Sequence, residues 1–266
     1  MTWITADFPN LPISVRQKIS AGTSTRTGGV STGEYHSLNI AAHVDDDPIN
    51  IQTNRAILRE QHSLPTEPYW LNQTHSNLVV ELPDGYHHNY VKSGYKFVEA
   101  DASYCRFSGH VCAVMTADCL PLLIVDEQAN EIAAIHAGWR GLANGVIENT
   151  LTKFNAANQK LHVWLGPAIG PRAFEVGQEV KDQFVAKDMN NEMCFITSAN
   201  CSIDSTKYLC DIYALAKVIL NAAGVENISG GDYCTVSDQA RFYSYRRDGQ
   251  TGRMVSMIWL NNETKN

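Results

Sequence analysis

The sequence predicts an α/β fold whose strands form mixed sheets. Short apolar segments alternate with segments whose apolar residues recur at helical spacing, and some connections between strands are short enough for hairpins. The chain has 266 residues, which is enough to bury a large core. It has no internal repeat and no low-complexity linker, so we expect residues 1–266 to form a single domain.

Three helices are predicted along the chain. The first spans 47–60, where an aspartate followed by a proline is a typical helix start. The second follows Gly138, where apolar residues form one helical stripe. This stripe consists of Leu142, Val146, Ile147, Thr150, Leu151 and Phe154. The third spans about 209–223 and ends at Gly224, a common helix-ending residue.

Seven segments have the length and apolar character of strands. They are Leu78–Leu82, Val111–Met115, Leu122–Val125, Glu131–Ala137, Leu161–Leu165, Arg241–Tyr245 and Met254–Leu260. Within the fourth, Ile132, Ala134 and His136 share one face. The polar stretches 83–93 and 190–206 are predicted to be irregular surface loops.

The composition excludes several classes of protein. Hydrophobic residues make up 44% of the chain and charged residues 18%, which argues against disorder. The formal net charge is −7 and no dense run of Lys or Arg occurs, so no nucleic-acid partner is expected. The sequence has neither an apolar run of membrane-spanning length nor a secretory signal pattern, so we expect a cytoplasmic protein without membrane contact. The seven cysteines are irregularly spaced and form no CxxC pair, which predicts mostly free thiols and no zinc ribbon.

Three segments place reactive residues between apolar ones. His75 precedes a predicted strand, Cys119 lies between two predicted strands beside a proline, and His136 ends a third. Two imidazoles and a thiolate can bind zinc or copper and leave a fourth position for water or substrate. A single buried cysteine usually contributes to packing, and a histidine at a strand end is usually a hydrogen-bonded structural residue. The spacing alone therefore does not distinguish a metal site from structural roles for these residues.

The same residues also suit a Cys–His hydrolase. Cys119 would be its nucleophile, His136 its base, and Asp118 or Gln73 the group that orients the base. A thiolate bound to a metal is a poor nucleophile, so this hypothesis competes with the metal site.

Arginines beside glycines are candidates for binding an anionic substrate. Arg26, Arg140 and Arg246 have such neighbours, and a guanidinium binds phosphate or carboxylate oxygens two at a time. Arg140 also lies at a predicted helix start, where free amides attract anions. The run 246–249 equally suits a salt-bridged hairpin turn. No phosphate-binding loop pattern is present.

Seven motifs together resemble the YfiH-like family, also called the polyphenol-oxidase or laccase-domain family. They are TRTGGVS (25–31), SLNIAAHVDDDP (37–48), NQTHS (72–76), TADCLPLLIVD (116–126), AAIHAGWRG (133–141), GPAIGP (166–171) and FYSYRRDGQTGRM (242–254). The resemblance extends from about residue 20 to about 260. It implies one domain, a layered sandwich of mixed sheets with helices outside. It also implies that His75, Cys119 and His136 bind Zn²⁺, with Cu²⁺ as the alternative.

The resemblance further implies phosphorolysis of adenosine, inosine, guanosine and methylthioadenosine, together with deamination of adenosine. For these reactions we predict that Arg26 and either Arg140 or Arg246 hold phosphate, and that Asp118 or Gln73 steers the water or the base. The partners would then be a purine nucleoside and phosphate, and the protein would be a monomer or a small homo-oligomer.

Three other functions stay open at this point. They are a hydrolase that edits peptidoglycan precursors, a copper-dependent polyphenol oxidase and a metal-storage protein. The nine histidines include no HxH pair, which argues against a multicopper cluster.

Overall fold

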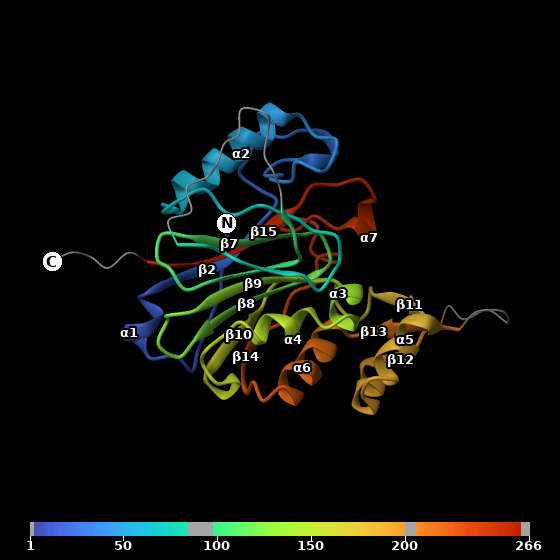
Figure 1. The fold of residues 1–266 in the computed structure, drawn as a ribbon. Helices are drawn as coiled ribbons and strands as arrows, with labels where there is room; N and C mark the ends of the chain where they lie inside the picture. Colours follow the sequence, from blue (N-terminus) through green and yellow to red (C-terminus); the bar gives the residue numbers. More distant parts are fainter. Residues whose placement is uncertain (1–2, 85–97, 200–205, 262–266) are drawn as a thin grey trace.

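The computed structural model describes residues 3–84, 98–199 and 206–261. Two sheets pack face to face at its centre, and helices cover the outer face of each (Figure 1). The predicted layered α/β sandwich is therefore confirmed. No helix in the described ranges is long and apolar enough to cross a membrane.

The larger sheets share most of the strands. The four-stranded sheet contains β1 (Trp3–Thr5), β2 (Ile19–Ser24), β15 (Met254–Leu260) and β7 (Val111–Thr116), in that order. The six-stranded sheet contains β14 (Asn227–Gly230), β10 (Leu161–Leu165), β8 (Leu120–Asp126), β9 (Ile132–Ala137), β6 (Ala102–Cys105) and β4 (Val79–Glu81), in that order. Pairing in the first is antiparallel throughout, whereas the second has a parallel pair at each edge. The second sheet is thus mixed, as predicted.

The remaining elements are shorter. One small sheet joins β11 (Glu175–Gly177), β13 (Lys207–Cys210) and β12 (Phe195–Thr197), and another joins β3 (Leu71–Asn72) to β5 (Val98–Glu99). The α-helices are α1 (Ile13–Arg16), α2 (Pro48–Gln61), α3 (Trp139–Ala143), α4 (Val146–Leu151), α5 (Gln178–Val185), α6 (Ile212–Ala222) and α7 (Tyr245–Asp248). The 3₁₀ turns are η1 (Gly33–Tyr35), η2 (Asn158–Lys160) and η3 (Met189–Cys194).

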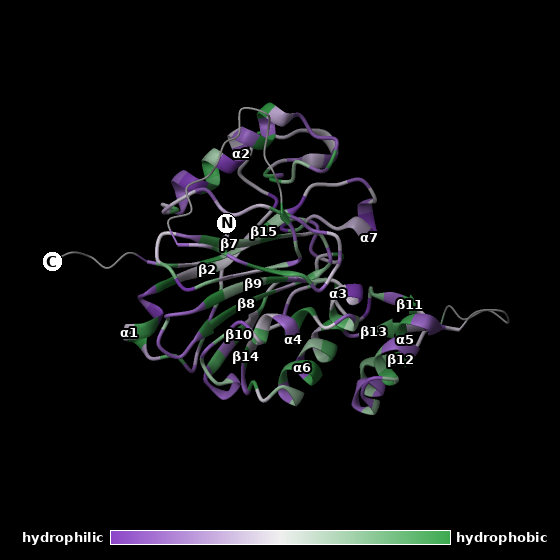
Figure 2. Ribbon diagram, viewed as in Figure 1, coloured by the Kyte–Doolittle hydropathy of each residue, from purple (hydrophilic) through white to green (hydrophobic). Residues whose placement is uncertain are grey.

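Alternation along the strands builds three hydrophobic layers. On β9, Ala133 and Ile135 pack toward α4 and α6, whereas Ile132 and Ala134 pack between the two sheets, as the period of two predicts. A third layer lies between the four-stranded sheet and α2. The strands of both sheets are accordingly mostly hydrophobic, while α7 is hydrophilic (Figure 2). His136 shares the face of β9 that is turned toward the other sheet.

Two helix boundaries agree with the prediction. The Asp47 side chain accepts a hydrogen bond from Ile49 N at 2.8 Å, and Pro48 is the first residue of α2. Gly224 follows α6 in the left-handed conformation, with φ at +85°.

Two helix predictions need correction. The helix expected after Gly138 is two helices, α3 and α4, because Gly145 between them has φ at +87°. The helix expected from about Leu209 begins later. Leu209 lies in β13, and the Asp211 side chain caps α6 by accepting from Ala214 N at 3.0 Å.

The predicted strand Arg241–Tyr245 is wrong. Phe242 N donates to Asp238 O at 3.0 Å, which makes a turn, and Ser244 caps α7. Phe242 is fully buried, so its apolar character reflects burial in an irregular segment. The hairpin considered for 246–249 is a short helix, although the expected ion pair forms within it, between Arg247 and Asp248.

The two predicted loops have different outcomes. Part of 190–206 is ordered as η3 and β12, so that prediction is wrong for these residues, and 200–205 lie outside the described residues. Of the stretch 83–93, only Pro83 and Asp84 are described, and both are irregular and exposed.

Candidate metal centre and its pocket

Cys119 lies where the chain crosses from one large sheet to the other. β7 belongs to the four-stranded sheet and β8 to the six-stranded sheet, and the short connection between them carries the cysteine. Asp118 has φ at +96° in this connection, a conformation that costs energy in a residue other than glycine and allows the sharp crossing. Because β8 pairs with β9, Cys119 lies beside the strand end that carries His136.

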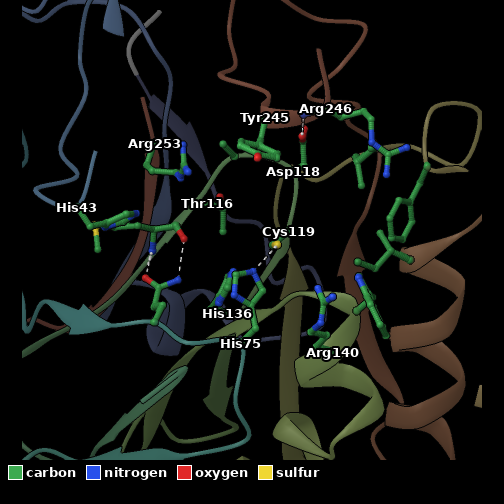
Figure 3. Close-up of a pocket in the computed structure, with 17 residues that line it drawn as sticks. His43, His75, Thr116, Asp118, Cys119, His136, Arg140, Tyr245, Arg246 and Arg253 are labelled. Carbon is green, nitrogen blue, oxygen red and sulfur yellow. Dashed lines mark hydrogen bonds between the residues drawn. The ribbon is translucent and has the colours of Figure 1, made fainter. Parts of the chain in front are cut away.

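The structure brings the three predicted ligands together (Figure 3). The ligand atoms of His75, Cys119 and His136 all lie within 4.8 Å of one another, and Cys119 Sγ is 3.7 Å from His75 Nε2. In a tetrahedral zinc site, Zn–S bonds of about 2.3 Å and Zn–N bonds of about 2.0 Å separate sulfur and nitrogen ligands by about 3.5 Å. The three residues therefore fit a zinc site with one position left open.

The carboxylate of Asp101, which was not predicted from the sequence, accepts hydrogen bonds from both histidines. Asp101 is fully buried. Its Oδ1 accepts from His136 Nδ1 at 2.7 Å and from His75 N at 3.0 Å. Its Oδ2 accepts from Ser76 N and Ser76 Oγ, both at 2.6 Å, and from Thr74 N at 3.2 Å. Because an ionised carboxylate only accepts, His136 Nδ1 carries the proton and Nε2 is left as the ligand atom.

The contact with Asp101 also explains the backbone at His75. This residue has φ at +60°, an uncommon conformation for a histidine. Three successive amides, from Thr74 to Ser76, point at the one carboxylate and stabilise this turn.

The glycine after β9 permits the close approach of the backbone to the trio. A Cβ atom on Gly138 would lie 2.9 Å from His75 Cδ2 and 3.0 Å from Cys119 Sγ. Both distances are shorter than normal contacts between carbon or sulfur atoms. Any larger residue would push two ligands apart.

The electrostatics of the trio favour a thiolate. Burial alone would raise the pKa of Cys119, but the charge of His136 and hydrogen bonds from both imidazoles lower it below the ordinary value. Burial would lower the pKa of His136, but the Cys119 thiolate and the Asp101 carboxylate raise it. Burial would raise the pKa of Asp101, but hydrogen bonds from His136 and Ser76 lower it to about 2. Without a metal, Cys119 is therefore a thiolate and His136 an imidazolium.

This electrostatic balance predicts how Cys119 reacts in the metal-free protein. The thiolate is the form that reacts with iodoacetamide. The ordinary pKa of cysteine is about 8.5, so alkylation of Cys119 should reach half its maximal rate at a clearly lower pH. Because the shift is downward, reactivity is retained as the pH falls from 8.5 and is lost only below the shifted pKa. Zinc should suppress the reaction.

The measurement is the rate of alkylation against pH, with the modified peptide identified by mass spectrometry. Identification matters because hydrogen bonds also lower the pKa of Cys234 against the effect of burial. The Cys119→Ser variant serves as the control and should lack the fast reaction. A midpoint at or above pH 8.5 for Cys119 would contradict the proposed thiolate.

A cavity of about 500 Å³ opens over the trio, within the range of about 300–1,000 Å³ typical of small-molecule sites. Arg253 and His43 lie on one side of the trio and Arg140 on the other, with Tyr245 at the rim (Figure 3). Apolar and aromatic side chains complete the wall. They are Met115, Ala117, Trp139, Ile169, Phe174 and Ile212. The lining contains three arginines and one aspartate, so the pocket is basic although the chain is acidic.

Four of the other predicted site residues line this cavity: Gln73, Asp118, Arg140 and Arg246. In Asp118 and Gln73, both polar atoms of the side chain are already hydrogen-bonded. The Asp118 carboxylate accepts from Thr235 Oγ1 at 2.5 Å and from Arg246 N at 2.6 Å, so it fixes the start of α7. The Gln73 amide donates to Met115 O and accepts from Met115 N, both at 2.8 Å. These contacts favour a positioning role for both side chains.

Two of the three predicted arginines, Arg140 and Arg246, line the pocket, and Arg26 lies outside it. Arg140 is exposed and stacks on the Trp139 ring, with its Cζ atom 4.3 Å from the ring centre. Arg246 is also exposed, and its Nη1 donates to two backbone carbonyls, those of Ala173 and Glu175. Arg26 does not line the cavity; its Nε donates to the carbonyl of residue 36 at 3.0 Å.

Three residues of the site were missed by the sequence analysis: Asp101, His43 and Arg253. Asp101 lies between two alanines, Ala100 and Ala102, and a second acid, Glu99, lies two residues before it, so no sequence feature distinguished it. Arg253 lies in the motif FYSYRRDGQTGRM (242–254), seven residues after Arg246, the arginine of this motif that was predicted to bind an anion.

Comparison with known proteins identifies the family of this chain. Residues 20–261 match the family described as multi-copper polyphenol oxidoreductase laccase. The chain belongs to this laccase-like family. A purine nucleoside phosphorylase of Pseudomonas aeruginosa is 47% identical over 258 residues, covering 97% of this chain and 98% of its own. The Escherichia coli protein named purine nucleoside phosphorylase YfiH is 48% identical over 242 residues, covering 91% and 94%.

Solved structures share the fold of this chain. Neisseria meningitidis protein NMB0706 superposes with a TM-score of 0.85 at 43% identity, covering 98% of this chain and all of that one. The Bacillus licheniformis protein YfiH gives 0.83 at 26% identity, covering 92% and 94%.

The ligand set does not suit the several coppers in the family's description. In the described ranges, the trio is the one group of three or more His, Cys, Asp and Glu side chains arranged to hold a metal. A multicopper centre needs further histidines around it.

Proposed function

We propose that this protein is a purine nucleoside phosphorylase whose active site is the pocket over His75, Cys119 and His136. The observation that carries the proposal is a basic, partly aromatic cavity of nucleoside size above a three-ligand metal site with an open position. The names of the laccase-like relatives from Pseudomonas and Escherichia point to the same reaction.

The reaction joins a phosphate oxygen to C1′ of the sugar while the bond from C1′ to the purine nitrogen breaks. The bonding electrons leave with the purine, and the proton of hydrogen phosphate ends on it, so the products are a free purine and a sugar 1-phosphate. Positioning and charge stabilisation supply most of the rate in such a displacement. The arginines would hold the phosphate, and the apolar wall would exclude water from the sugar.

The trio would add a second capability. A zinc ion bound there supplies a Lewis acid and lowers the pKa of water. On this basis we propose that the enzyme also deaminates adenosine, in which a water oxygen bonds to the ring carbon and ammonia leaves. The proposed substrates of phosphorolysis are adenosine, inosine, guanosine and methylthioadenosine. Asp101 would keep both histidines oriented while either reaction proceeds.

Two other enzyme functions are candidates with their own observations. The Cys119–His136–Asp101 arrangement resembles a nucleophile, base and orienting acid, which would suit a hydrolase such as an editor of peptidoglycan precursors. The orienting acid would then be Asp101, in place of Asp118 or Gln73. The family's description would suit a copper-dependent polyphenol oxidase.

The test is to incubate the purified protein with adenosine, with and without phosphate, and to identify the products. We expect adenine and ribose 1-phosphate only with phosphate, and inosine with or without it. Removing the metal with a chelator should abolish deamination, and zinc should restore it. Elemental analysis of the same sample gives the metal and its stoichiometry. Absence of ribose 1-phosphate in the metal-replete sample would refute the phosphorylase.

A further inference from the structure

The three arginines of the pocket differ in their exposure to solvent. Arg140 and Arg246 are exposed, whereas Arg253 is half-buried. An exposed guanidinium gains little from an anion because water and salt screen the pair. Burial lowers the pKa of Arg253, which means that its charge is incompletely solvated. This arginine therefore has the most to gain from an anionic ligand.

Arg253 is also held in place by the backbone. Its Nη1 donates to the carbonyls of Thr251 at 2.8 Å and Gly252 at 3.0 Å, and its own amide donates to Asn39 Oδ1 at 3.0 Å. It directly precedes β15, a central strand of the four-stranded sheet. A guanidinium fixed in this way loses little entropy when it binds a ligand.

The other edge of this guanidinium has no partner. Within the described part of the chain, the Nε and Nη2 atoms of Arg253 make no hydrogen bond, and no carboxylate forms an ion pair with it. Two parallel N–H groups of this kind match two oxygens of a phosphate. Figure 3 shows the side chain directed into the cavity, on the same side as His43.

The opposite side of the cavity suits the purine better. Arg140 stacks on Trp139 there, and the guanidinium of Arg246 lies 5.7 Å from the centre of the Phe174 ring. Flat side chains of this type bind flat aromatic ligands. The trio lies between this side and Arg253. The sugar of a bound nucleoside would lie over the trio, between the purine and Arg253.

We propose that the free edge of the Arg253 guanidinium binds the attacking phosphate, on the side of the trio opposite Arg140 and Trp139. This inference rests on the proposed phosphorylase function and changes its phosphate site. From the sequence, phosphate was expected to bind Arg26 with Arg140 or Arg246. Arg26 does not line the cavity, and the other two arginines border the aromatic side.

The experiment compares Arg253→Gln with the wild type in steady-state kinetics of phosphorolysis and deamination. Losing a hydrogen-bonded charge should raise the KM for phosphate about tenfold to a hundredfold. The KM for adenosine should rise much less than the KM for phosphate. Arg253→Lys keeps the charge without the paired N–H groups, so its KM for phosphate should lie between those of the wild type and Arg253→Gln. Arg106→Gln, at an exposed arginine paired with Glu81 outside the cavity, should match the wild type.

Calorimetric titration with inorganic phosphate reports binding without turnover, so it separates this inference from the phosphorylase function. Phosphate should bind the wild type and bind Arg253→Gln at least about tenfold more weakly. If Arg253→Gln binds phosphate as the wild type does, while Arg140→Gln does not, the inference is wrong and phosphate lies on the aromatic side. If the wild type binds no phosphate by calorimetry, the inference is also wrong. Thermal unfolding of each variant checks that the fold is intact.

Discussion

The Cys119→Ala variant should lose its metal and the proposed deamination of adenosine. The thiolate is one of three ligands, and the remaining imidazoles of His75 and His136 would hold zinc poorly. Loss of an outer-shell hydrogen bond to a zinc ligand already costs about 10- to 100-fold in affinity. Loss of a ligand should therefore lower zinc affinity more than a hundredfold, with a matching loss of deamination.

The measurements are metal content after dialysis, zinc affinity in competition with a chromophoric chelator, and the rates of product formation. Cys234→Ala is a matched control, because Cys234 is also half-buried and its pKa is also lowered, yet it does not belong to the trio. This control should retain metal and activity. A Cys119→Ala protein that keeps one zinc per chain but has no activity would instead identify the cysteine as a nucleophile.

The sequence predicted the parts of the fold that depend on a strong local pattern. The strands at the centre of the sandwich are fully buried and apolar, and the alternation in β9 assigned its two faces correctly. The start of α2 was predicted because a cap and a proline are local features. The edge strands β1, β11 and β14 were not predicted, and neither were β2 and β6 inside the large sheets, because tertiary pairing stabilises these strands more than their own residues do.

The errors have physical causes that the local sequence hides. Phe242 looks like part of a strand because the protein interior selects apolar residues irrespective of backbone conformation. The chain crossing at Asp118 and the turn at His75 both use positive φ without a glycine, so no residue type marked them. The break at Gly145 was marked by its glycine, but a continuous apolar stripe outweighed it.

The candidate site was predictable as three residues but not as an arrangement. Family resemblance pointed to His75, Cys119 and His136, and the fold brings them together from two separate connections and the end of β9. Which groups surround them depends on contacts between residues far apart in sequence. Asp101 is 35 residues from His136, and no spacing rule connects an acid to a histidine at that distance. The surrounding residues therefore required the structure.

Replacing Asp101 with asparagine should weaken metal binding although Asp101 touches no metal position itself. The carboxylate uses both oxygens as acceptors, for two donors on Oδ1 and three on Oδ2. An asparagine can offer one oxygen, and its NH₂ group would face either His136 Nδ1 or the donors of Ser76. One of the two histidines would then lose its fixed orientation. The expected loss in zinc affinity is about 10- to 100-fold.

The matched control is Asp126→Asn, at the far end of β8 from Cys119. Asp126 is also buried, and its carboxylate also accepts from three backbone amides, those of Gln128, Asn130 and Glu131. Both substitutions should lower the melting temperature, because each leaves amides with a poorer acceptor. Only Asp101→Asn should lower metal affinity in the chelator competition.

The spectrum of the cobalt-substituted protein separates positioning of the ligands from general destabilisation. The wild type and Asp126→Asn should share the same strong visible bands of tetrahedral cobalt, with a thiolate charge-transfer band at shorter wavelength. Asp101→Asn should shift or weaken the visible bands at saturating cobalt, because His136 or His75 no longer meets the ion in a fixed orientation. An unchanged cobalt spectrum together with unchanged zinc affinity would show that packing around the trio orients the two imidazoles without the carboxylate.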